Sequence, residues 1–86
     1  MTKPNMSVNE LVGRLVRPRV KTFIDASTRE LFIGHTGLII EADWDPEDRL
    51  LYVRIFVNNS YIEREYKSLS IFRQFWLDWA VTENPE

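Results

Sequence analysis

Three runs of apolar and β-branched residues, each closed by turn-forming residues, occupy the middle of the chain. The runs cover residues 37–44, 50–57 and 61–66, and residues 45–48 and 58–60, rich in Asp, Pro and Asn, separate them. Short apolar runs divided in this way are typical of antiparallel strands joined by hairpin turns. The pattern therefore predicts a meander of strands in this part of the chain.

Alternation is clearest in the run 50–57. One set of side chains is wholly aliphatic and is expected to face the core: Leu51, Val53, Ile55 and Val57. The opposite set contains Tyr52 and Phe56, because successive side chains of a strand point to opposite faces of the sheet. Two aromatic side chains on this second face predict that another element covers it.

The N-terminal part predicts a helical turn, a strand and a long loop. Residues 7–13 begin with Ser, carry Glu three positions later in the pattern of a capping box, and end on Gly13, a natural helix stop. Residues 14–20 place β-branched Val beside Pro18, which suits an edge strand. Residues 21–36 mix turn formers with apolar residues and are expected to fold back as a loop.

Helical spacing replaces alternation near the C-terminus. Five apolar positions recur at i, i+3, i+4, i+7 and i+8: Phe72, Phe75, Trp76, Trp79 and Ala80. This spacing predicts an amphipathic helix over 72–82, followed by a polar tail over 83–86.

Two uses of this helix stay open. Folded back on the sheet, it covers Tyr52 and Phe56; turned outward, it exposes an aromatic patch that needs a partner. Leu77 and Val81 lie off the stripe, so apolar surface is left outside in either case. We therefore expect a protein interface built from the C-terminal apolar residues: Phe72, Phe75, Trp76, Leu77, Trp79 and Val81.

Length and composition fit one small domain over residues 1–86. Apolar residues make up 44% and aromatic residues 13% of the 86, enough for a dense core, and the chain has no cysteine. The absence of cysteine excludes disulfides, thiol nucleophiles and cysteine-based zinc sites. No apolar run is long enough to cross a membrane, and the first residues lack a signal-peptide pattern, so we expect a cytoplasmic protein that does not contact membranes.

Charge is distributed unevenly although the net charge is only −2. Residues 1–40 hold six basic against three acidic residues, and residues 41–86 hold five against ten. A basic cluster near the N-terminus could contact nucleic acid or an acidic partner: Arg14, Arg17, Arg19 and Lys21. Alternatively, these arginines pair with Glu63 and Glu65 across neighbouring strands.

No metal, cofactor or catalytic site is expected. The acidic stretch 41–48 imitates the opening of a calcium loop, but Asp48 stands where the turn needs Gly, and Arg54 stands where the bidentate Glu is needed. His35 is the only histidine and has no nucleophile to serve. We therefore expect a non-enzymatic protein.

The order of motifs resembles that of Src-homology-3-like (KOW-like) small barrels. The resemblance rests on Gly-x-Leu-Val-x-Pro at 13–18, a Gly-led apolar strand at 34–40, a Val-x-Ile strand and Tyr-x-x-Leu-x-Ile at 66–71. It implies a short turn at 67–68 and a last strand that places Leu69 and Ile71 inside. The fold class expected is thus mainly β, a single antiparallel barrel of about five strands over 14–71, with a helical turn before it and a helix after it.

A short barrel with a Leu-Val-Arg-Pro opening, here at 15–18, and an acidic, aromatic hairpin also resembles small proteins encoded by tailed bacteriophages. That resemblance implies a virion part or a binder of host proteins. The expected function is that of a non-enzymatic structural or protein-binding component that docks into a larger assembly, or associates with itself, through its aromatic C-terminal helix. Nucleic-acid binding through the basic segment 14–21 and inhibition of a host enzyme are the alternatives.

Overall fold

The computed structural model describes residues 8–19 and 24–80. In chain order its elements are the 3-10 turn η1 (Val8–Leu11), β1 (Arg14–Pro18), α1 (Ala26–Glu30), β2 (Gly37–Asp45), β3 (Leu50–Val57), β4 (Ser60–Tyr66), α2 (Leu69–Phe75) and β5 (Trp76–Ala80). The predicted fold class is confirmed: the chain is mainly β, with a helical turn at its N-terminal end and a helix near its C-terminal end.

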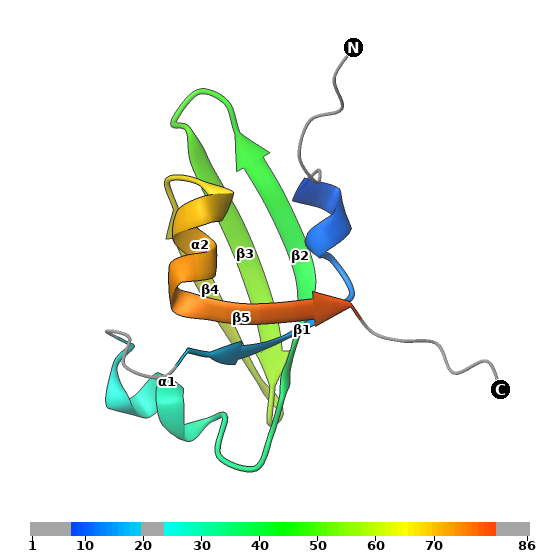
Figure 1. Ribbon diagram of the computed structural model, residues 1–86, viewed down its shortest axis with the longest axis vertical. Coiled ribbons are helices and arrows are strands. Elements are labelled where there is room, and N and C mark those ends of the chain that lie inside the picture. Colours follow the sequence, from blue (N-terminus) through cyan, green and yellow to red (C-terminus); the bar gives the residue numbers. More distant parts are fainter. Residues whose placement is uncertain (1–7, 20–23, 81–86) are drawn as a thin grey trace, which may run out of the picture.

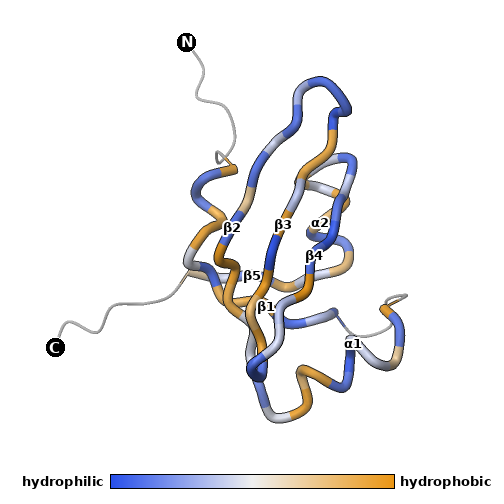
Figure 2. Tube along the Cα trace, turned by 180° about the vertical axis from the view of Figure 1, so that it is seen from behind, coloured by the Kyte–Doolittle hydropathy of each residue, from blue (hydrophilic) through white to orange (hydrophobic). Residues whose placement is uncertain are grey.

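The five strands form one antiparallel sheet in the order β4-β3-β2-β1-β5. Strands β2, β3 and β4 run along the length of the molecule, and the shorter β1 and β5 run across them (Figure 1). η1 lies beside β2, and α2 leads directly into β5 (Figure 1). The hydrophilic turn between β2 and β3 lies at one end of the molecule (Figure 2).

Strand β3 supplies the centre of the core. The four aliphatic side chains predicted to face inward are fully buried: Leu51, Val53, Ile55 and Val57. The intervening residues Tyr52, Arg54 and Phe56 are half-buried on the opposite face. We call the face that carries these three residues the outer face of the sheet.

The inner face is closed by aromatic residues from elements that are distant in the sequence. Phe32, Phe72 and Trp76 join the same core cluster, and the Phe32 and Trp76 rings lie 5.4 Å apart. The indole Nε1 of Trp76 donates a 2.7 Å hydrogen bond to the Tyr66 hydroxyl, so this buried donor is satisfied.

The end of the predicted C-terminal helix is a strand. We expected a helix over 72–82, whereas α2 covers Leu69–Phe75 and Trp76–Ala80 pair with β1. Ser68 caps the helix by accepting a hydrogen bond from the Ile71 N–H at 3.1 Å. Trp76–Ala80 do not alternate between apolar and polar residues, so the backbone partners offered by β1, and not a local pattern, account for the strand.

Two further expectations were wrong for the same reason. Leu69 and Ile71 do not form the last strand, because they belong to α2. Nor does the C-terminal helix cover Tyr52 and Phe56, because Phe72 packs into the core on the inner face.

The segment predicted to be a loop contains the short helix α1. Asp25 caps it by accepting from the Thr28 N–H at 3.2 Å and from the Thr28 hydroxyl at 2.8 Å. Arg64 of β4 donates a 2.8 Å hydrogen bond to the same Thr28 hydroxyl, which ties α1 to the sheet. Residues 20–23 and the Ser of the predicted capping box lie outside the described residues.

Gly37, the first residue of β2, lies close against core side chains. A methyl group here would stand 2.7 Å from Ile55 Cγ2, 2.8 Å from Phe32 Cε2 and 3.2 Å from Val16 Cγ2. Overpacking of this kind costs about 1–3 kcal/mol, so we expect Gly37→Ala to lower the free energy of unfolding in urea by that amount. Gly34→Asn is the control, because Gly34 has open space around it. Its φ of +74° is in the left-handed region, which Asn adopts at a cost of about 1 kcal/mol or less. A Gly37→Ala variant as stable as the unmodified protein would contradict this packing.

Candidate protein-interaction surface

A stripe of apolar side chains crosses all five strands on the outer face. The β registers place one residue of each strand beside the next, in the order Tyr61, Phe56, Leu38, Leu15 and Trp79 from β4 to β5. We call these five residues the outer stripe. The Phe56 and Tyr61 rings are 5.1 Å apart, so this end of the stripe is in direct contact.

Both ends of the outer stripe are open to solvent. Tyr61 is 58% exposed and Trp79 is 37% exposed, whereas the three residues between them are half-buried. Leu77, two residues from Trp79 on the same face of β5, is 46% exposed. A continuous row of apolar side chains with exposed aromatic residues at both ends is typical of surfaces that bind other proteins.

Carboxylates line one long side of the outer stripe. The first row beside it contains Glu41, Arg54 and Glu63, with Arg54 lying 3.6 Å from Glu41 and 3.5 Å from Glu63. The second row contains Asp43 and Glu65 on either side of Tyr52. We call these two rows, with four carboxylates and one arginine, the acidic rows.

The acidic rows contribute to a raised pKa of Tyr52. Its pKa lies above its ordinary value of 10.0, first because the ring is partly desolvated and then because Glu63 and Glu41 disfavour a phenolate. The local field on this side of the sheet is therefore negative and would attract basic groups.

The predicted interface residues separate into core and surface. Phe72 and Trp76 are fully buried, and Phe75 packs against the core. Phe72 and Trp76 are therefore not part of the exposed surface and Phe75 is only partly buried, whereas Leu77 and Trp79 are exposed. Val81 lies outside the described residues.

The predicted basic cluster is divided between the two faces of β1. The half-buried Arg14 lies 3.3 Å from the Asp78 carboxylate on the inner face, and the exposed Arg19 donates from Nε to the Arg73 carbonyl oxygen at 2.6 Å. Arg17 is exposed on the outer face, beside Leu77. Lys21, the fourth member, lies outside the described residues, so the described arginines do not form a continuous basic face.

The expected pairing of the arginines with Glu63 and Glu65 was also wrong. β1 lies between β2 and β5, whereas both glutamates are on β4, which β3 and β2 separate from β1. Glu63 instead faces Arg54 of β3.

The acidic hairpin and the histidine are exposed. Asp45 ends β2 and Asp48 lies in the turn that follows, where the Asp45 side chain accepts a hydrogen bond from the Asp48 N–H at 3.3 Å. Residues 8–19 and 24–80 contain no group of three or more His, Cys, Asp or Glu side chains that could hold a metal ion. His35 is exposed between α1 and β2. Among the described helices, none is long and apolar enough to cross a membrane.

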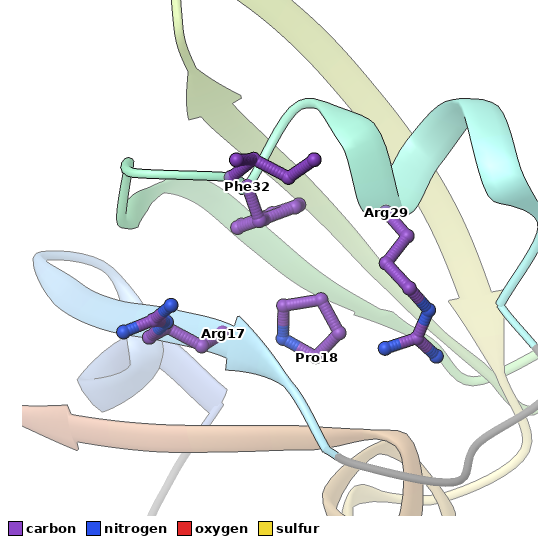
Figure 3. A pocket seen from close by; sticks show the side chains of 5 residues that line it. Arg17, Pro18, Arg29 and Phe32 are labelled. Atoms are coloured by element: carbon purple, nitrogen blue, oxygen red, sulfur yellow. The ribbon is translucent and has the colours of Figure 1, made fainter.

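A small pocket of about 250 Å³ opens between β1 and α1. Its lining comprises Arg17, Pro18, Arg29, Phe32 and Ile33. Figure 3 shows the Arg29 side chain extending from α1 toward Pro18, with Arg17 on the other side of the proline ring. We call it the arginine pocket.

Hydrogen bonds at the start of α1 lower the pKa of Asp25 from 3.8 to about 2. The Ser27 hydroxyl is the main donor, followed by the Thr28 hydroxyl and N–H. Because the folded-state pKa is the lower one, the stabilisation is present above about pH 4 and is lost as the pH falls through about 2.

Ser27→Ala tests this cap. With the largest contribution removed, we expect the Asp25 carboxyl to titrate above about 2, toward its ordinary 3.8, when followed by carbon-detected NMR, and acid unfolding to begin at higher pH. Ser70→Ala, an exposed serine on α2, is the matched control and should leave the Asp25 titration unchanged. An Asp25 midpoint near 3.8 in the unmodified protein would contradict the hydrogen bonding described.

Comparison with protein-family models, with curated protein sequences and with solved structures finds no significant match. The resemblance to Src-homology-3-like barrels and to phage proteins stays a prediction, because a small antiparallel sheet is common to many unrelated proteins.

Proposed function

We propose that this protein is a non-enzymatic binding module that docks onto another protein through the outer face of its sheet. The outer stripe and Leu77 form the apolar contact, and the acidic rows fix the orientation. The proposal moves the interface from the predicted C-terminal helix to β5 and the strands beside it. A structural part of a virion, or a binder of host proteins in the cytoplasm, is the setting that the phage resemblance favours.

The single observation that carries the proposal is the continuity of the outer stripe. One apolar or aromatic residue from each of five strands lies in the same row, and Trp79 and Tyr61 at the two ends are substantially exposed. Isolated exposed apolar residues are normal on a protein surface, but a contiguous row of them is not.

The charges beside the stripe favour a partner different from this chain. The acidic rows lie on β2, β3 and β4, so the partner should present basic residues along one side of an apolar surface. Two copies could dock face to face in two ways. A two-fold axis parallel to the strands would place the acidic rows of one copy against those of the other, where they repel. A two-fold axis parallel to the outer stripe would place Arg17 of one copy over β1 of the other, away from the carboxylates that it could pair with.

Site-specific crosslinking in the native cells tests the proposal. A p-benzoyl-L-phenylalanine side chain in place of Trp79 or of Tyr61 should give the same single protein adduct. In place of Glu47, in the exposed turn between β2 and β3, it should give none. Glu63→Lys should weaken the adduct at position 79 by at least about fivefold, because close charges across an interface make couplings of about 1.5 kcal/mol or more.

Asp48→Lys makes the same charge change in the turn and is the control that should leave the adduct intact. Adducts only between copies of this chain, or equal loss in the Glu63 and Asp48 variants, would contradict the proposal. Crosslinking to nucleic acid from position 17, with none to protein from position 79, would favour the nucleic-acid alternative.

A further inference from the structure

We propose that the arginine pocket binds a carboxylate that is carried next to an apolar side chain. The inference deepens the proposed function, since it assigns the chemistry of one end of the segment that docks on the outer face.

Two guanidinium side chains reach the arginine pocket from different elements. Arg17 comes from β1 and Arg29 from α1, and both line the same space (Figure 3). Guanidinium groups present planar pairs of N–H donors that match the two oxygens of a carboxylate.

The other described residues that line the arginine pocket are apolar. Phe32 is buried beneath it against Trp76, Pro18 lies between the arginines in Figure 3, and Ile33 is 71% exposed. Ile33 is the most exposed large apolar side chain of the described residues, so a ligand that covers it gains the burial of apolar area. An anion without an apolar group would leave this surface open to water.

The size of the arginine pocket selects a small group. A volume of about 250 Å³ lies below the range of roughly 300–1,000 Å³ usual for drug-sized ligands. One or two amino-acid residues fit such a space better than a nucleotide cofactor does. A planar carboxylate also needs fewer donors than a phosphate dianion, which carries more charge and more acceptor oxygens.

The arginine pocket continues the outer face. Arg17 is the register partner of Leu77, and Leu77 shares its face of β5 with Trp79 of the outer stripe. The arginine pocket and the acidic rows thus lie on opposite long sides of the outer stripe. A bound segment that places basic residues on the acidic rows could therefore place a carboxylate in the arginine pocket. The two charged regions together give the bound segment one preferred direction.

NMR titration of the purified protein tests this site with defined probes. N-acetyl-L-phenylalanine should shift the backbone signals of Arg17 and Ile33 in a saturable manner. N-acetyl-L-phenylalaninamide, which lacks the carboxylate, and acetate, which lacks the ring, should each bind at least about fivefold more weakly. N-acetyl-Phe-Asp-amide separates an internal aspartate from a chain-terminal carboxylate as the source, and binding by either of them supports the site.

Arg17→Gln should weaken the binding of N-acetyl-L-phenylalanine about fivefold, whereas Arg49→Gln, the same charge change at the exposed turn between β2 and β3, should not. Three results would each overturn the proposal. The acid and its amide could bind equally, acetate and inorganic phosphate could bind equally with no contribution from the ring, or the Arg17→Gln variant could bind normally.

The two proposals can fail separately. Trp79→Ser should abolish docking of the partner and leave probe binding unchanged, because the probes need only the arginine pocket. Probe binding without a crosslinked partner would overturn the docking proposal alone, and a partner without probe binding would overturn the carboxylate site alone.

Discussion

The pairing of β5 with β1 is the interaction on which the rest of the structure depends. It turns Trp76 into the core and Leu77 and Trp79 toward solvent. The inward-facing Asp78, whose side chain is only 4% exposed, lies 3.3 Å from Arg14 and 3.0 Å from Arg73, so one carboxylate links β1, β5 and α2. Removal of either arginine would leave part of a buried charge uncompensated, which proteins tolerate poorly.

The same pairing explains how one aromatic segment serves two purposes. Phe72 and Trp76 close a core that an 86-residue chain could not otherwise fill, and Tyr66 satisfies the indole N–H. Trp79, only three residues beyond Trp76, is left at the end of the outer stripe. A surplus of aromatic area at the C-terminus is thus real, but it belongs to a strand and not to a helix.

Local sequence patterns predicted the fold where one period was dominant. The alternation in β3 gave the buried set from Leu51 to Val57, and the mainly β class followed from it. The pattern failed after Phe72, because apolar residues continue at helical spacing through Trp79 and Ala80 although Trp76–Ala80 form a strand without alternation by two. The strand depends on the backbone partners offered by β1, a segment about 60 residues away that no local period reveals.

The candidate surface could be predicted in part. Leu77 and Trp79 were expected at an interface, but Leu15, Leu38 and Phe56 join them only through the strand registers, which no local pattern reveals. The division of Arg14 and Arg17 between two faces follows from the same registers. The residues of the candidate surface are therefore brought together by the strand order and registers and not by a local sequence motif.

The position of Trp79 relative to Leu15 tests the account most directly. Nuclear Overhauser contacts between the two residues, measured in the labelled full chain, should join β5 to β1, with the Trp79 indole accessible to a paramagnetic probe and the Trp76 indole protected from it. Contacts between residues three and four apart over Trp76–Ala80, with no contact to Leu15, would show a continued helix and would contradict the outer stripe and both proposals built on it.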